Sequence, residues 1–115
     1  MNFDHLNILL VCNLGYSTGT MVTKMREIAD KSEKLKNIPI EIEARPAGEF
    51  NDLVQDFDVV LVGPQIRHQF SRLKKIADEY NKPIEVIDSE DYGTVNGANI
   101  LKAAILLKTK TEKGE

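Results

Sequence analysis

Residues 8–22 read ILLVCNLGYSTGTMV, a continuous aliphatic run followed by a segment rich in Gly, Ser and Thr. A run such as Ile8 to Val11 is typical of a parallel strand that is covered on both faces. Val59 to Val62 repeats this pattern, and residues 84–87, which follow Lys82 and Pro83, indicate a further strand. These three segments therefore predict strands of a parallel sheet.

Alternation of residue types indicates one further strand. Ile38, Ile40 and Ile42 alternate with proline or glutamate. Because a period of two is typical of a half-exposed strand, we expect this segment at an edge of the sheet.

Between the strands, hydrophobic residues recur at helical spacing. They predict a helix around Met21 to Ala29, a second that follows Pro64 and reaches Tyr80, a third around Ala98 to Ile105 with Asn96 as its N-cap, and a short helix within residues 47–55. Strands that alternate with helices favour right-handed crossovers. We therefore predict an α/β fold: an open, parallel, four-stranded sheet of order 2-1-3-4 with helices on both faces, doubly wound as in flavodoxins and low-molecular-weight phosphatases.

Length and charge limit the class of protein. The 115 residues suffice for a single domain, residues 1–115, whose tail, residues 108–115, we expect to be frayed. A net charge of −3 provides no overall basic field for nucleic acid. The apolar runs are too short to span a membrane, and the N-terminal MNFDHLN lacks the basic start of a secretory signal. A cytoplasmic protein with a protein or small-molecule partner is expected.

The predicted strand order also predicts the site. Ligands of open parallel sheets bind beyond the carboxyl ends of the strands, where the strand order reverses. With order 2-1-3-4, that point lies between the first and third strands. Cys12 to Gly19 follow the first strand, Gly63 to Gln65 follow the third, and Asp88 and Ser89 follow the fourth.

Cys12 is the single cysteine of the chain. A loop that enters a helix N-terminus presents unpaired amides to an anion. Gly15 and Gly19 permit tight turns, and the hydroxyl groups of Ser17, Thr18 and Thr20 add donors. In such surroundings the pKa of a thiol falls and the thiolate becomes a nucleophile. The alternative is that Cys12 is only a small buried hydrophobe.

Two enzyme or cofactor classes also use a loop of this kind. Low-molecular-weight cysteine phosphatases need an arginine six positions after the cysteine, where this chain has Thr18, so a phosphatase is disfavoured. Flavodoxins bind phosphate through a Ser/Thr/Gly loop, which Ser17 to Thr20 faintly resembles. The chain has no Trp and no evident pair of rings to hold a flavin.

From about Leu6 to Leu107, the sequence resembles the IIB components of the lactose/cellobiose class of the bacterial sugar phosphotransferase system. Residues 12–19 resemble the family loop C-S-A-G-M-S-T-S, although Asn13, Leu14, Tyr16 and Gly19 depart from it. Further matches, in chain order, are residues 22–26, 60–66, 83–88, 92–93 and 101–104. Several matching segments in order are more specific than the loop alone.

The resemblance implies a relay. A IIA protein would pass a phosphoryl group from phosphohistidine to Cys12, and Cys12 would pass it to a sugar held by the membrane IIC component. The implied phosphate-binding loop comprises Asn13, Leu14, Gly15, Tyr16, Ser17, Thr18 and Gly19, and the supporting or docking residues are Gly63, Pro64, Gln65, Arg67 and His68. The relay needs no cofactor or metal, and it implies a monomer that approaches the membrane only through IIC. The sequence does not identify the sugar.

The remaining candidates have simpler interpretations. We expect Gly63, Pro64 and Gln65 to shape the Cys12 loop rather than to react. Asp88 is expected to cap the turn at Ser89. Arg45 is a candidate for the docking face, and His5 is expected to be exposed near the terminus.

Overall fold

The computed structural model describes residues 5–12, 16–33 and 35–112. Within these ranges, four parallel strands form one sheet of order β2-β1-β3-β4, as predicted. The strands are β1 (Leu6–Cys12), β2 (Ile40–Pro46), β3 (Val59–Val62) and β4 (Ile84–Val86). The helices are α1 (Tyr16–Lys31), α2 (Phe50–Leu53), α3 (Phe70–Glu79), α4 (Ser89–Gly93) and α5 (Gly97–Glu112). Three 3₁₀ segments, η1 (Ala47–Glu49), η2 (Val54–Asp56) and η3 (Pro64–Gln69), adjoin α2 and α3.

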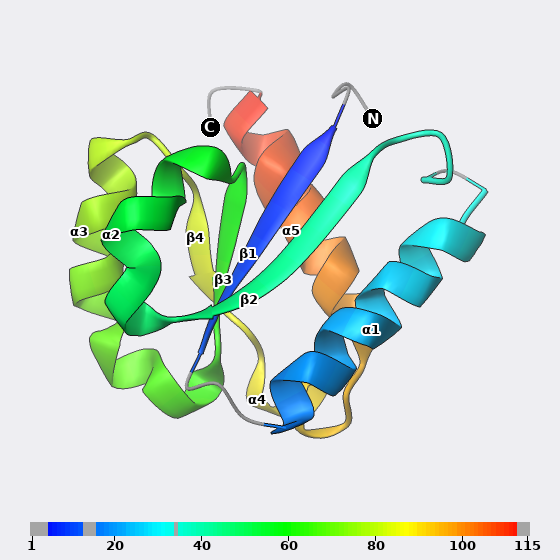
Figure 1. Ribbon diagram of the computed structural model, residues 1–115, viewed down its shortest axis with the longest axis horizontal. Coiled ribbons are helices and arrows are strands. Elements are labelled where there is room, and N and C mark those ends of the chain that lie inside the picture. The colour runs from blue at the N-terminus through cyan, green and yellow to red at the C-terminus, as the bar shows by residue number, and fades with distance from the viewer. Residues whose placement is uncertain (1–4, 13–15, 34, 113–115) are drawn as a thin grey trace.

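Helices cover both faces of the sheet (Figure 1), which explains the aliphatic runs. Ile8 and Leu10 of β1 pack on the side of α1 and α5, while Leu9 and Val11 pack on the side of α2 and α3. Successive side chains of a strand point to opposite faces, so a strand covered on both faces must be apolar throughout. β3 is buried along its whole length for the same reason.

The predicted edge strand is confirmed. β2 pairs only with β1 among the described strands, from Leu6 opposite Ile40 to Cys12 opposite Pro46. Ile42 is buried, whereas Glu41 is exposed. One face of β2 thus meets the core and the other is open to solvent.

The predicted helices are present, and local capping sets the starts of α5 and α4. The backbone N–H of Asn99 donates a hydrogen bond of 3.0 Å to the side-chain oxygen of Asn96, as expected for an N-cap. Asp88 caps α4 by accepting hydrogen bonds of 3.1 Å from the amides of Glu90 and Asp91. The capping role of Asp88 is confirmed, but α4 was not predicted as a helix from the sequence.

The tail differs from the expectation that residues 108–115 are frayed. Residues 108–112 continue α5, and 113–115 lie outside the described residues. Leu107 is partly buried against the core, and the Lys108 ammonium lies 3.7 Å from the Asp58 carboxylate. These contacts favour helix beyond the point where the apolar pattern of the sequence ends.

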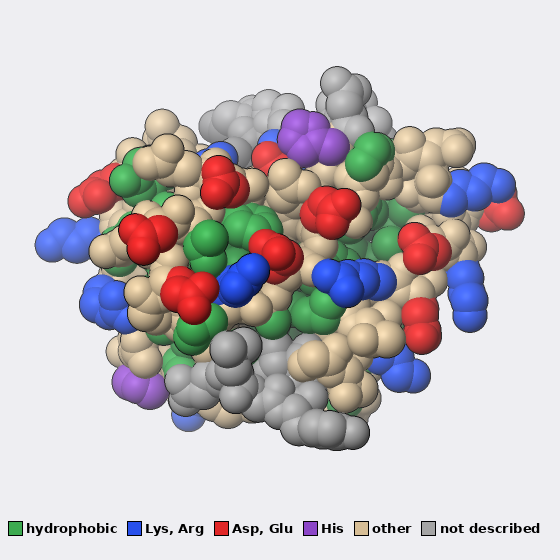
Figure 2. All heavy atoms as spheres, viewed as in Figure 1, with side chains coloured by type: hydrophobic (Ala, Val, Ile, Leu, Met, Phe, Trp, Pro, Cys, Tyr) green, Lys and Arg blue, Asp and Glu red, His purple; other side chains and the backbone are tan. Residues whose placement is uncertain are grey.

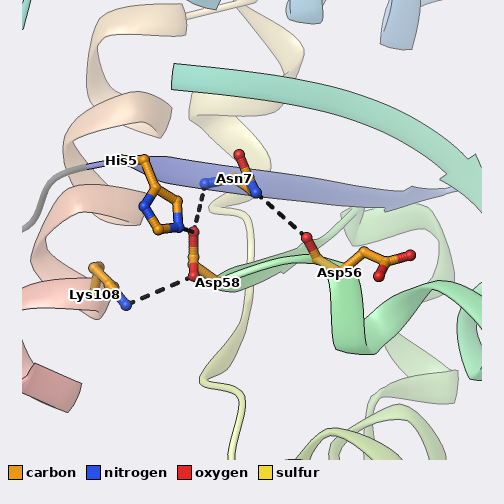
Figure 3. Close-up of polar contacts among 5 residues, drawn as sticks. All are labelled: His5, Asn7, Asp56, Asp58 and Lys108. Atoms are coloured by element: carbon orange, nitrogen blue, oxygen red, sulfur yellow. Dashed lines mark hydrogen bonds and ion pairs between the residues drawn. The ribbon is translucent and has the colours of Figure 1, made fainter. Parts of the chain in front are cut away.

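Asp58 joins three segments at the end of the sheet where β1 begins (Figure 3). Its carboxylate accepts a hydrogen bond of 2.7 Å from the backbone N–H of Asn7 and lies 3.6 Å from His5 Nε2. The His5 side chain is largely exposed, as expected. Lys108 reaches the same carboxylate from α5. This cluster holds the start of β1, the start of β3 and the end of α5 together.

Candidate functional site

The carboxyl ends of the strands lie together at the end of the sheet near α4 and the start of α1 (Figure 1). Cys12 is the last residue of β1 and lies opposite Pro46 of β2. On its other side, β1 neighbours β3, and Gly63 follows β3 directly. The sequence predicted this switch point between the first and third strands, and the strand order confirms it.

Cys12 is only 2% exposed. A thiolate in such a position would be surrounded by protein groups rather than by bulk water. Thiolates are the nucleophilic form of cysteine, and a nearby helix N-terminus favours them. The start of α1 follows Cys12 after residues 13–15.

The structure describes only part of the segment predicted to bind phosphate. Asn13, Leu14 and Gly15 lie outside the described residues, so the expected turn at Gly15 does too. Tyr16, Ser17, Thr18 and Gly19 form the first turn of α1 instead of a loop. Phosphate binding by these residues stays a prediction, and it is compatible with a helical start because the first turn of an α-helix has backbone N–H groups without intrahelical partners.

Gly19 does not supply the tight turn that the sequence suggested. It lies within α1, where a Cβ atom built on it would meet nothing within 4 Å. Its carbonyl accepts a hydrogen bond of 3.1 Å from the Thr23 hydroxyl. Neither its conformation nor its surroundings therefore require glycine.

Space beside Gly63 is limited. Its backbone is extended, with φ −62° and ψ 140°, a conformation that any residue can adopt. A Cβ atom on Gly63 would lie 3.1 Å from Gln65 Oε1 and 3.5 Å from Cys12 Cβ. The Gly63 amide also donates a hydrogen bond of 2.8 Å to the Val11 carbonyl. The turn after β3 is thereby held directly against the end of β1.

An open cleft lies between η3 and α4. Its lining residues are Pro64, Gln65, Arg67 and His68 from η3, and Ser89, Tyr92 and Gly93 from α4. The candidates predicted from the segment after β3 thus lie along one wall, except Gly63. Tyr92 and Gly93 were not predicted as site residues from the sequence. The signal in the sequence that could have indicated α4 is Asp88, a capping residue followed by acidic residues.

Arg67 and His68 are exposed. Neither takes part in an ion pair with the residues that the structure describes. Arg45, the third predicted docking residue, lies 3.5 Å from Glu43 and 3.7 Å from Glu49. Figure 2 shows acidic and basic side chains interspersed on the face that carries α2 and β2. Arg45 therefore belongs to a local charge network, whereas Arg67 and His68 remain available to a partner.

Metal-binding groups and membrane-spanning helices are two further features relevant to function. In residues 5–12, 16–33 and 35–112, no three or more His, Cys, Asp or Glu side chains are grouped so that they could hold a metal ion. Of the helices in these ranges, none has both the length and the apolar character needed to cross a bilayer.

Comparison with known proteins gives one consistent result. The family model described as "PTS system, Lactose/Cellobiose specific IIB subunit" matches residues 7–103. The oligo-beta-mannoside-specific EIIB component of Bacillus subtilis (strain 168) is 38% identical over 100 residues, covering 87% of this chain and 93% of the relative. The cellobiose-specific EIIB component of Lactococcus lactis subsp. lactis is 31% identical over 102 residues, covering 84% of this chain and 91% of the relative.

Solved structures agree with the sequence relatives. The cellobiose-specific phosphotransferase IIB component from Borrelia burgdorferi has a TM-score of 0.75 and 40% identity, covering 93% of this chain and 94% of that one. The lactose-specific IIB domain from Streptococcus pneumoniae also has a TM-score of 0.75, covering 90% of this chain and 97% of that one. Its identity of 16% makes it evidence for the fold alone.

Proposed function

Because this chain belongs to the family of lactose/cellobiose-specific IIB subunits of the sugar phosphotransferase system, we propose that it carries its phosphoryl group on Cys12. The chain is a phosphocarrier for sugar uptake and performs a phosphotransferase step in sugar phosphorylation. A carrier needs one nucleophile at the end of the fold that its partners approach. Cys12 is the single cysteine of the chain and ends β1 at the switch point of the sheet.

The proposed relay has two displacements at phosphorus. The Cys12 thiolate attacks a phosphohistidine of IIA, so that the S–P bond forms while the N–P bond breaks and the imidazole leaves. A hydroxyl group of the sugar bound to IIC then attacks the same phosphorus. The S–P bond breaks, the thiolate returns, and the sugar hydroxyl loses its proton. Transfer of this kind depends mainly on position and on electrostatic stabilisation.

Backbone amides are the proposed phosphate ligands. They belong to the predicted phosphate-binding residues Asn13, Leu14, Gly15, Tyr16, Ser17, Thr18 and Gly19. The position of α1 supports this proposal, since a helix N-terminus stabilises negative charge. No Arg or Lys occurs between Cys12 and Lys24. A phosphoryl group held without a charged clamp suits a carrier better than a phosphatase.

The proposed partners are a IIA phosphohistidine protein and the membrane IIC component. Both must reach the same sulfur, so both would dock at the carboxyl end of the sheet in turn. The cleft between η3 and α4 supports this surface, because Arg67 and His68 present donors there that could meet acidic groups of a partner. Relatives of comparable identity are named for oligo-beta-mannoside, galactose and cellobiose, so we assign the choice of sugar to IIC.

The test is phosphorylation in a reconstituted system. Purified chain is incubated with phosphoenolpyruvate, the general phosphotransferase proteins and IIA, and its intact mass is measured. We expect one added phosphate on the wild type and none on Cys12→Ser. We also expect Cys12 to release negligible phosphate from p-nitrophenyl phosphate. Phosphorylation of Cys12→Ser, or Cys12-dependent turnover of p-nitrophenyl phosphate at enzymatic rates, would contradict the proposal.

A further inference from the structure

Gly63 brings Gln65 and Cys12 together from different segments. The position that a Cβ atom of Gly63 would occupy lies 3.1 Å from Gln65 Oε1 and 3.5 Å from Cys12 Cβ. Both side chains therefore approach the same point, one from η3 and the other from the end of β1. Only a residue without a Cβ leaves the space between them open.

The backbone around Gln65 is held on both sides. Pro64 restricts its own φ at the start of η3, and Ile66 is fully buried. The Ile66 amide donates a hydrogen bond of 3.1 Å to the Gly63 carbonyl. Gln65 is exposed as a residue, but its Oε1 atom lies toward the Cβ position of Gly63. The turn therefore fixes the backbone from which the Gln65 side chain reaches this point.

The chemistry of this side chain suits a phosphoryl ligand. A carboxamide has two N–H donors, and rotation about its last bond exchanges the positions of its nitrogen and oxygen. Phosphoryl oxygens accept hydrogen bonds from such donors, but a neutral donor binds them less strongly than arginine does. We propose that the Gln65 amide donates a hydrogen bond to the phosphoryl group on Cys12, beyond its role in shaping the turn. This inference rests on the proposed phosphorylation of Cys12.

Gln69 provides a matched control. It is also a glutamine of η3, but its Oε1 accepts a hydrogen bond of 2.6 Å from Arg72 and it does not line the cleft. The variants are Gln65→Ala, Gln65→Glu and Gln69→Ala. Each is phosphorylated by IIA in a single turnover at saturating donor, and the phosphocysteine is examined by ³¹P NMR. Thermal unfolding of each variant measures any loss of stability.

For Gln65→Ala we expect a saturating rate lower by about five- to tenfold, as for loss of one neutral hydrogen bond, together with a changed ³¹P shift. Gln65→Glu should be slower still, because a carboxylate repels the phosphoryl oxygens. Gln69→Ala should match the wild type in rate and shift. All three should unfold near the wild-type temperature, so that a change at phosphorus is not attributable to misfolding.

Three results would overturn the inference while the proposed function stands. The first is a wild-type rate and shift in Gln65→Ala. The second is a change only in the concentration of IIA needed for saturation, which would indicate docking. The third is an equal effect of Gln69→Ala. A wild-type chain that takes no phosphate on Cys12 would instead contradict the proposed function itself.

Discussion

Gly63 shows how one residue can set the geometry of a site without taking part in the chemistry. Its backbone angles are ordinary, so conformation does not explain the glycine. The limited space between Gln65 and Cys12 is the feature that glycine leaves open. Its place after a strand singled out Gly63 in the sequence, but its proximity to Cys12 joins residues 51 positions apart in the chain.

We expect Gly63→Ala to slow phosphoryl transfer while hardly changing the free energy of unfolding. The added methyl group would press most closely on the flexible end of Gln65, at 3.1 Å, while its contacts of 3.5 Å with Cys12 Cβ and the Val11 carbonyl are ordinary. The free energy of unfolding should therefore change by less than about 1 kcal/mol, since a flexible side chain can move. The displaced Gln65 amide should slow phosphorylation severalfold. Urea unfolding and single-turnover phosphorylation measure the two effects.

Gly48→Ala is the control for this prediction, because a Cβ atom there would meet nothing within 4 Å. It should leave the transfer rate unchanged. A Gly63→Ala variant with a wild-type rate would show that the space beside Cys12 is not needed for transfer.

At the scale of secondary-structure elements, α1 and α5 approach each other closely at Gly97. A Cβ atom on Gly97 would lie 3.1 Å from Lys24 Cβ, 3.2 Å from the Lys24 carbonyl carbon and 3.1 Å from Ile28 Cδ1. Backbone atoms cannot move aside as a side-chain end can. The periodicity of the sequence predicted both helices, but it could not reveal their separation, because that depends on how they pack over the sheet.

Gly97→Ala should therefore destabilise the protein. We expect a loss of about 1–3 kcal/mol in the free energy of unfolding, the usual cost of overpacking, because α5 must shift away from α1. Gly19→Ala in α1 is the opposite case, since its Cβ has open space and alanine favours a helix by up to about 1 kcal/mol. Urea unfolding of both variants checks the pair. Equal stabilities would contradict the close approach at Gly97.

At the scale of the whole molecule, the two ends of the sheet differ in the groups that they carry. The carboxyl end carries Cys12 and the cleft, whereas the opposite end is held by Asp58 with Asn7, His5 and Lys108 (Figure 3). The Asp58 side chain is 16% exposed, so its contacts are partly shielded from water. We therefore expect that stability and the proposed transfer can be altered separately.

We expect Asp58→Ala to reduce stability and to leave transfer unchanged. The substitution removes the acceptor of the Asn7 amide and the carboxylate beside Lys108. Loss of a partly buried acceptor costs about 1–3 kcal/mol. The control is Asp78→Ala, which breaks only the exposed pair with Lys74 and should cost less than about 0.5 kcal/mol. Urea unfolding tests stability. A slower single-turnover phosphorylation in Asp58→Ala at a temperature where the variant is folded would contradict this separation.

The sequence by itself determined the features that depend on neighbouring residues. Aliphatic runs predicted the buried strands, alternation predicted the β2 edge, and the Asn96 and Asp88 caps act within three residues along the chain. Such patterns can be read because strand and helix periods are local. The resemblance of several ordered segments also indicated the family before any fold was known.

Only the tertiary structure decided which distant residues meet. It brought Gln65 beside Cys12 across Gly63, made α4 a wall of the cleft, and joined Lys108 to Asp58. It also started α1 at Tyr16 within the segment predicted as a loop. Contacts of this kind depend on how the crossovers place whole elements against one another. Local patterns in the sequence do not reveal the distances between those elements. The separation of the α-helices and the shape of the turn after β3 are therefore properties of the packed molecule.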